Sequence, residues 1–429
     1  MPGLRLLVVT YFYPPDGSVG SHRWPAMARY LRRLGHEVTV LTTSAFGTLP
    51  DDEPWVVRTA DLQGAAVLRR VLRRPPVVPA GGAAGPLPAA PRILTDGLVP
   101  DAHVASWLPF VIPAARRLVR QRQIDCVVTN GPPDSTHLLG LALGRRRPAW
   151  VVDMEDGWRF EPLRGPWPTR AQDRLDAALE RRVARAADGG IGLAEPIATD
   201  LVTRLGGHAA YVPNAWDPDL DEAVAAAVPP ALEPGTFSLV HTGGLSHGRR
   251  RDPRPLFAAL GLLAREAPAE AARLRLVLTG RLSAADAALL DALPPEVRRL
   301  VPHLGALSRE QGVGLQRGAD ALLLLVTGEH RSQVTGKLFE YLATGRPILA
   351  LADDNEAARI VRATGTGRVV DPGDPGAIAA ALRATLAGDL AAAYAPRGVE
   401  AYRFPAPAEA MARAIEDAIA RRRTTAGSA

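Results

Sequence analysis

Cysteine, lysine and long apolar runs are nearly missing from this sequence of 429 residues. The only cysteine, Cys126, excludes an intramolecular disulfide framework and a cysteine-based zinc cluster. It lies in an apolar run, which predicts a buried and inert thiol. No apolar run is long enough to cross a bilayer, and Met1 opens no recognisable signal peptide. We therefore expect a cytoplasmic protein.

Aromatic residues are also scarce, at 5% of the chain, whereas the formal net charge is +6. A nucleic-acid-binding surface favours a basic stripe with interleaved aromatic residues, so nucleic acid is not an expected partner. The charge points only weakly to an anionic ligand or surface. The basic run at residues 67–74 (VLRRVLRR) is compatible with contact to an acidic membrane surface, although an exposed insertion is the commoner explanation.

Short apolar runs alternate with helical patterns along the whole chain. Runs that are apolar throughout predict strands buried on both faces, and their alternation with helices indicates parallel sheets. The pattern restarts after a linker at residues 217–235. The sequence therefore predicts an α/β fold with two doubly wound, Rossmann-like domains facing each other across a cleft. The predicted domains are residues 1–216 and 217–403, and a helix within residues 404–429 is expected to cross back to the first domain.

The first loop at a predicted strand end is YFYPPDGSVGSHR, which carries Gly17, Ser18 and Gly20 just before a helix. Doubly wound sheets bind ligands at the carboxyl ends of their strands. Glycines at such a loop let the backbone approach an anion closely. A dinucleotide-binding motif would follow the strand immediately, whereas Pro14 and Pro15 intervene here. A plain structural turn remains the alternative.

Three glycines of the second half also follow predicted strands: Gly243, Gly244 and Gly280. The first two stand in HTGGLSHGRRRDPRP, where four arginines lie close to the start of a helix. Arginines beside a strand end can clamp phosphate oxygens by bidentate hydrogen bonds. The alternative is a solvated basic loop.

The single lysine of the chain, Lys337, lies in VTGKLFEYLATGRPILAL. A short helix is predicted from about Gly336 to Thr344, which places Thr335, Gly336 and Lys337 at its N-terminus. Free amides and one ammonium group there suit a diphosphate. Glu340 shares the helical face of Lys337, three residues on. A simple ion pair between the two is the alternative to a role in which Glu340 binds a ribose diol.

These stretches resemble the GT-B type nucleotide-sugar glycosyltransferases, within the large retaining family 4 group. The resemblance spans nearly the whole chain. It rests on LLVVTYFYPPDGSVGSHR, on TNGPPDSTHLLGLAL with PAWVVDMEDGW, on YVPNAWD, and most specifically on KLFEYLATGRPILAL with the GTGRVVDPGD that follows.

The resemblance carries donor-binding roles to matching positions. Glu340 matches the second glutamate of the Glu-x7-Glu signature, which binds the nucleotide ribose. Ser332 stands at the first glutamate position, so a contact of that residue to the donor sugar is not implied. No arginine after Gly244 matches the family's phosphate-binding arginine cleanly; Arg251 is our substitute, and Lys337 completes the clamp. The Gly17 to Gly20 loop matches the one that meets the donor phosphates from the opposite domain.

The acceptor side departs from the family pattern. Asp134 stands where the subgroup often has histidine, and Glu155 stands where it often has arginine. Together with Asp156 they are the candidate acceptor-side residues, with simple capping as the alternative. His137 begins the helix after the two prolines and is a candidate to orient or deprotonate the acceptor. A structural histidine at a helix start is equally compatible with the sequence.

The expected reaction moves a sugar from a nucleoside-diphosphate sugar to a small-molecule or glycan acceptor. The resemblance implies retention of anomeric configuration, and fixed amides, arginine and lysine would stabilise the leaving diphosphate without a metal or another cofactor. Asp217-Pro218-Asp219 has the form of a metal-binding motif but lies in the linker. Natural-product and cell-envelope glycosylation are both expected roles. The alternatives are a GT-B nucleotide-sugar epimerase or hydrolase, and a non-catalytic sugar-binding protein.

Overall fold

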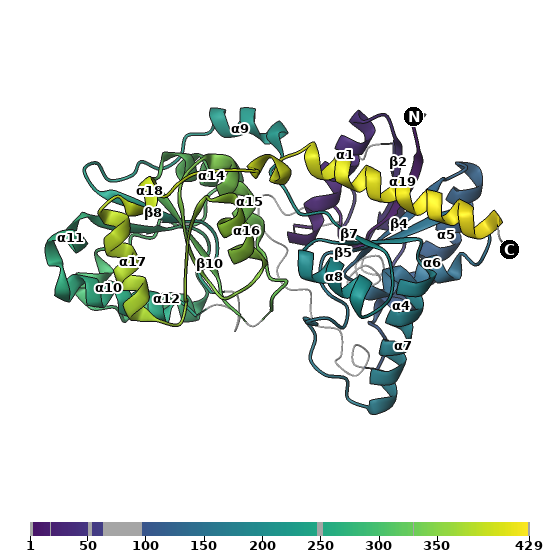
Figure 1. Ribbon diagram of the computed structural model, residues 1–429, viewed down its shortest axis with the longest axis horizontal. Helices are drawn as coiled ribbons and strands as arrows, with labels where there is room; N and C mark the ends of the chain where they lie inside the picture. The colour runs from purple at the N-terminus through teal and green to yellow at the C-terminus, as the bar shows by residue number, and fades with distance from the viewer. Residues whose placement is uncertain are drawn as a thin grey trace, which may run out of the picture. The chain divides into compact units, whose positions relative to one another are not determined.

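The computed structural model describes residues 3–17, 19–49, 54–62, 97–246, 252–328 and 330–427. The chain divides into two compact units. Unit 1 comprises residues 1–214 and 405–429, and unit 2 comprises residues 215–404. Both are drawn in Figure 1. Residues 67–74 and most of the proline- and glycine-rich segment after them lie outside the described residues.

In its described part, unit 1 is built on a seven-stranded sheet with the order β3-β2-β1-β4-β5-β6-β7. Every pairing in it is parallel. The strands are β1 (Arg5–Val9), β2 (Glu37–Thr43), β3 (Val56–Thr59), β4 (Cys126–Gly131), β5 (Ala149–Met154), β6 (Gly189–Gly192) and β7 (Ala209–Tyr211). The sequence missed β3 because this edge strand has only four residues, all half-buried.

The helices of unit 1 pack on both faces of the sheet, where two apolar clusters form the core. They are η1 (Val19–Ser21), α1 (Arg23–Arg33), α4 (His103–Ser106), α5 (Leu108–Gln121), η2 (Asp134–His137), α6 (Leu138–Ala142), α7 (Arg170–Ala186), α8 (Glu195–Thr203) and α19 (Ala406–Gly427). Cys126 is fully buried in β4, as its apolar surroundings predicted.

The C-terminal helix α19 belongs to unit 1, where it packs against α1, β5 and β6 (Figure 1). Its buried residues recur at helical spacing: Ala408, Met411, Ile415 and Ala418. Such a stripe buries one face of a helix against the core. The helix is fixed further by Arg421, whose Nε donates to the carbonyl of Asp188 at 2.7 Å.

Unit 2 contains, over its described residues, a five-stranded sheet with the order β12-β11-β10-β8-β9, again parallel throughout. The strands are β8 (Phe237–His241), β9 (Leu274–Leu278), β10 (Ala321–Val326), β11 (Ile348–Ala352) and β12 (Gly367–Val370). Two parallel sheets of this kind confirm the prediction of an α/β fold with two Rossmann-like domains.

The unit 2 helices form one large apolar core with the sheet. They are η3 (Pro218–Leu220), α9 (Asp221–Ala226), α10 (Arg254–Glu266), α11 (Pro268–Arg273), α12 (Ala284–Asp291), α13 (Pro295–Arg298), α14 (Arg309–Gly318), α15 (Gly336–Thr344), α16 (Glu356–Thr364), α17 (Pro375–Leu386), α18 (Asp389–Ala392) and η5 (Val399–Tyr402). Among the helices of the described ranges, none is both long and apolar enough to span a bilayer.

The first part of the predicted linker folds into unit 2. Trp216 and Val224 are buried together with Val313 of α14, so η3 and α9 are packed elements rather than free chain. Trp216 also pairs with the returning chain, since its amide donates to the carbonyl of Tyr402 at 2.9 Å and its carbonyl accepts from the amide of Phe404 at 3.0 Å.

Candidate active site

Three predicted donor-site residues of unit 2 lie together at the carboxyl ends of its strands. Gly243 follows β8 with φ of +87°, and a Cβ atom built on it would lie 2.5 Å from Cε and 2.8 Å from Nζ of Lys337. Gly280 follows β9 with φ of +106°, and its Cβ would lie 2.7 Å from the carbonyl carbon of Gly243. Both the positive φ and the close approach require glycine here. We call Gly243, Gly280 and Lys337 the glycine–lysine site.

Lys337 reaches this position from the first turn of α15. The helix begins at Gly336 and ends at Gly345, which has the left-handed φ of 71°. This agrees with the predicted bounds and with glycine as the terminating residue. Thr335 precedes the helix in an extended conformation, and its side chain makes no capping hydrogen bond. The positive end of the helix dipole therefore adds to the ammonium charge at this place.

The start of α15 is locked to the sheet by Tyr341. This fully buried side chain accepts from the amide of Thr242 at 3.2 Å and donates to the carbonyl of Leu323 at 3.3 Å. Its hydroxyl thereby joins the end of β8 and the middle of β10 to the helix that carries Lys337. The sequence did not indicate this role for Tyr341, because a tyrosine at a buried helical position looks like an ordinary core residue.

Glu340 is half-buried and pairs with Arg309 of α14, whose Nε lies 3.1 Å from its Oε1. Gln316, also on α14, donates to Thr242 at 2.8 Å and lies 3.5 Å from the second oxygen of Glu340. The geometry thus gives Glu340 a partner that the sequence did not indicate, because Arg309 is 31 residues away along the chain. The carboxylate is oriented by α14.

Among the described residues, no close contacts define the roles of the other predicted donor-site residues. A Cβ on Gly244 would find its nearest neighbour at 3.7 Å, and one on Gly20 would find the Phe12 side chain at 3.8 Å. Packing therefore does not require glycine at these two positions. Gly17 lies in the loop before η1. Ser18 and Arg251 lie outside the described residues, together with the two arginines before Arg251.

In unit 1, the three candidate acceptor-side carboxyl groups gather at the ends of β4 and β5. Burial raises the pKa of Asp134 well above its ordinary value, and Asp101, Asp176 and Asp156 raise it further against the effect of Arg164. Asp156 also raises the pKa of Glu155, so it lies within the electrostatic reach of both other predicted residues. We call Asp134, Glu155 and Asp156 the carboxylate group; all three are half-buried.

Glu155 has the most defined geometry of the three. Asn130 at the end of β4 donates to its Oε1 at 3.0 Å and to Asp153 at 3.2 Å, while the Oδ1 of Asn130 accepts from Thr10 at 2.9 Å. Burial raises the pKa of Glu155 to about 8, with Arg23 acting in the opposite direction and Asp153 adding to the rise. A carboxyl group that titrates near neutral pH can donate or accept a proton at the site.

His137 has no exposed surface. Its Nδ1 lies 2.9 Å from the hydroxyl of Thr129, and a Cβ on Gly131 would lie 2.6 Å from its Nε2. Its ring also stacks on Trp158, and burial lowers its pKa to about 3. This placement favours the structural alternative over contact with an acceptor, because the ring is enclosed beneath the end of β4.

A buried ion pair that the sequence did not indicate lies beside the carboxylate group. The guanidinium of Arg23 on α1 lies 3.4 Å from Asp153, which also accepts from Trp24 at 3.1 Å. Arg23 donates further to the carbonyls of Val212 and Pro213 and to the side chain of Asn214. The pair therefore ties α1 and β5 to the last residues of unit 1 before the chain enters unit 2. The sequence showed the motif YVPNAWD, but it did not indicate that Arg23, 191 residues before Asn214, contacts it.

Over the described ranges, no cluster of three or more His, Cys, Asp or Glu residues is arranged to hold a metal ion. Asp217 of the Asp217-Pro218-Asp219 sequence has a local role, since its side chain accepts from the amide of Asp219 at 3.1 Å and caps η3.

Comparisons with known proteins agree with this architecture. Residues 21–215 match the glycosyl transferase 4-like domain, and residues 236–388 match the glycosyl transferases group 1. Together the two matches account for most of the chain, and the protein belongs to the GT-B glycosyltransferases. The matches are consistent with the family 4 group. No curated protein matches the sequence significantly.

Solved structures share the fold at low sequence identity. A structure assigned as UDP-N-acetylglucosamine 2-epimerase from Listeria monocytogenes is 12% identical with a TM-score of 0.55, over 96% of each chain. The UDP complex of S. aureus MnaA is 13% identical with a TM-score of 0.51, over 95% of this chain and 94% of that one. UDP-GlcNAc 2-epimerase from Neisseria meningitidis, bound to UDP-GlcNAc, is 13% identical with a TM-score of 0.55, over 96% and 100%.

Proposed function

We propose that the protein transfers a sugar from a nucleoside-diphosphate sugar to a small-molecule or glycan acceptor. The transfer retains the anomeric configuration and needs no metal ion. The observation that carries the proposal is the glycine–lysine site, where the only lysine of the chain lies against the backbone of Gly243 beside the N-terminus of α15.

The glycine–lysine site suits a leaving diphosphate. Negative charge develops on that group as the glycosidic bond breaks, and preorganised positive groups lower the barrier where the charge appears. Lys337 and the first-turn amides of α15 supply such charge, with Thr335 and Gly336 at the helix start. Glu340, held by Arg309, would accept from the ribose hydroxyls. Gly244, Gly17, Ser18, Gly20 and Arg251 remain predicted contacts of the donor.

The carboxylate group suits the acceptor. Asp134, Glu155 and Asp156 can accept hydrogen bonds from acceptor hydroxyl or amino groups. Glu155, with its raised pKa, is the one best placed to exchange a proton near neutral pH. Natural-product and cell-envelope glycans are the acceptor classes we favour.

The proposal is tested by thermal unfolding with UDP-, GDP- and dTDP-sugars and the free diphosphates. A ligand that binds only the folded protein raises the apparent midpoint with the logarithm of its concentration over Kd. We expect one nucleotide to give a clear shift that excess chelator leaves unchanged. No shift with any nucleotide would overturn the donor assignment, and a shift abolished by chelator would overturn metal independence.

A nucleotide-sugar 2-epimerase is the second candidate, because two of the solved structures with this fold carry that assignment. The two reactions differ in their products. A transferase consumes donor only in the presence of an acceptor and gives a new glycoside with the donor's anomeric configuration. An epimerase returns an isomerised donor when no acceptor is added. Chromatography and NMR of the products separate the two.

A further inference from the structure

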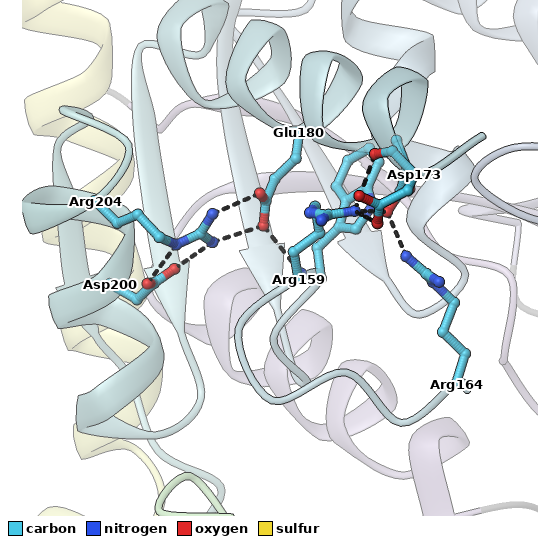
Figure 2. A network of polar contacts seen from close by, with 8 residues as sticks. Arg159, Arg164, Asp173, Glu180, Asp200 and Arg204 are labelled. Atoms are coloured by element: carbon cyan, nitrogen blue, oxygen red, sulfur yellow. Dashed lines mark hydrogen bonds and ion pairs between the residues drawn. The ribbon is translucent and has the colours of Figure 1, made fainter. Parts of the chain in front are cut away.

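Helix α7 of unit 1 has two faces of opposite charge. Each of its three acidic residues is paired with an arginine from outside the helix, as Figure 2 shows for Asp173 and Glu180. The ion pairs are Asp173 with Arg159 at 2.9 Å, Asp176 with Arg159 at 3.0 Å and with Arg164, and Glu180 with Arg204 at 2.8 Å. All three acidic residues of α7 therefore have arginine partners inside unit 1.

The opposite face of α7 carries only positive charge. Arg170, Arg174, Arg181 and Arg185 follow one another at intervals of four, seven and four residues, which places them on one side of a helix with 3.6 residues per turn. Arg182 flanks this row. All five side chains are exposed, and none has an acidic partner among the residues that the structure describes. We call these five arginines the α7 basic face.

The α7 basic face is shaped for anionic groups. Small residues, Ala178 and Ala186, separate its arginines, and a hollow of about 410 Å³ opens between them and Arg181, Arg182 and Arg185. Several guanidinium groups around one hollow can share a phosphate through bidentate hydrogen bonds. Leu175 is 50% exposed at the edge of this face. An exposed leucine beside arginines matches the boundary between headgroups and acyl chains.

We propose that the α7 basic face docks the protein reversibly onto an anionic lipid surface. Each arginine near such a surface contributes about fivefold in affinity, so five arginines suffice for reversible binding without an inserted segment. The occupant is a lipid surface rather than nucleic acid, because the face bears an exposed leucine and no aromatic side chain on which bases could stack. The proposal does not depend on the reaction that the protein catalyses.

The test is co-sedimentation of the full-length protein with vesicles. We expect binding to vesicles of phosphatidylcholine mixed with phosphatidylglycerol and none to phosphatidylcholine alone, with binding decreasing as salt is raised. The triple variant Arg181→Gln, Arg182→Gln, Arg185→Gln should bind about a hundredfold more weakly. Its midpoint of thermal unfolding should equal that of the wild type, which shows that the variant is folded.

A matched control removes the same charge elsewhere. Arg265, Arg273 and Arg299 are exposed in unit 2, and their triple glutamine variant should keep at least most of the vesicle binding. Equal losses of vesicle binding in the two triple variants would mean that net charge alone determines binding, which would overturn the assignment to α7. The proposal would also be overturned if the wild type failed to bind anionic vesicles in low salt, or bound only a polyanion such as single-stranded DNA.

Discussion

The two units present opposite chemistry at equivalent edges of similar sheets. In unit 2, the carboxyl ends of β8, β9 and β10 meet two glycines in left-handed conformations, one lysine and the N-terminus of α15. In unit 1, the ends of β4 and β5 carry the carboxylate group, with the pKa values of Asp134 and Glu155 raised by burial. One edge is suited to negative charge and the other to hydroxyl or amino groups.

The two sheet edges differ in the structural feature that determines their electrostatic properties. The glycine–lysine site relies on close backbone approach, since a side chain on Gly243 or Gly280 would displace neighbouring atoms. The carboxylate group relies on burial, which raises the pKa values of Asp134 and Glu155. Substitutions should therefore act on ligand affinity in unit 2 and on pH dependence in unit 1.

The largest expected effect follows from Lys337→Met, which keeps the length of the side chain and removes its charge. Loss of a charge-assisted hydrogen bond to phosphate should weaken nucleoside-diphosphate binding roughly 10- to 100-fold. Lys337→Arg should retain part of the affinity. Calorimetry measures the Kd values, with Arg368→Met as a control that removes an exposed charge from the same unit. An unchanged Kd in Lys337→Met would remove the phosphate role.

The next effect is expected from Gly243→Ala. The new methyl group would meet the end of Lys337, and φ of +87° would be strained by about 1–2 kcal/mol. We expect a lower midpoint of thermal unfolding and about tenfold weaker diphosphate binding. Gly318→Ala on α14 is the control, because a Cβ there would meet its nearest neighbour, the Leu232 side chain, only at 3.8 Å. In a Lys337→Ala background the alanine at position 243 should cost no further affinity; an additive loss would mean that the two positions act independently.

A smaller and more selective effect should follow from Glu340→Gln. If Glu340 accepts from the ribose, the variant should bind nucleoside diphosphate about tenfold more weakly and inorganic diphosphate as well as the wild type does. Lys337→Met should weaken both ligands. Glu296→Gln, an exposed change on α13, serves as the control. Equal losses for both ligands in Glu340→Gln would contradict the ribose assignment.

The sequence predicted most of the strands because their apolar runs are local, and it predicted α15 because Gly345 marks its end. The separate contacts of Lys337 and Glu340 could not be predicted, since both depend on where distant segments meet. Gly243 lies 94 residues before Lys337 along the chain, and Arg309 approaches Glu340 only because α14 packs beside α15. Composition also pointed to a linker around Pro218, whereas Trp216 and Val224 turn that segment into part of unit 2.

Side-chain burial also could not be predicted from the local sequence pattern. His137 and Glu155 both stand next to strand ends, and residue type alone made them comparable candidates. The structure separates them, because the ring of His137 is enclosed beneath Gly131 whereas Glu155 remains half-buried beside Asn130. The two have pKa values of about 3 and about 8, so only Glu155 titrates near neutral pH.

The last prediction concerns the pH dependence of stability. Because the pKa of Glu155 is raised from 4.5 to about 8 on folding, the folded protein binds a proton that the unfolded chain releases between these values. Stability must therefore decrease as pH rises through this window, by at most about 1.4 kcal/mol per pH unit. Glu155→Gln cannot titrate, so its apparent midpoint of thermal unfolding should change less between pH 5 and 8 than that of the wild type.

The pKa of Asp134 is also raised, so Asp134 makes stability decrease with rising pH in both the wild type and Glu155→Gln. The difference between their two curves of stability against pH therefore isolates Glu155. Lys337→Met provides the comparison from the other unit. Its curve should parallel that of the wild type, because the substitution lies in unit 2 and leaves Glu155 and Asp134 in place. Parallel curves for wild type and Glu155→Gln would show that Glu155 is ionised like an exposed carboxylate, and the contrast between the two edges would then rest on unit 2 alone.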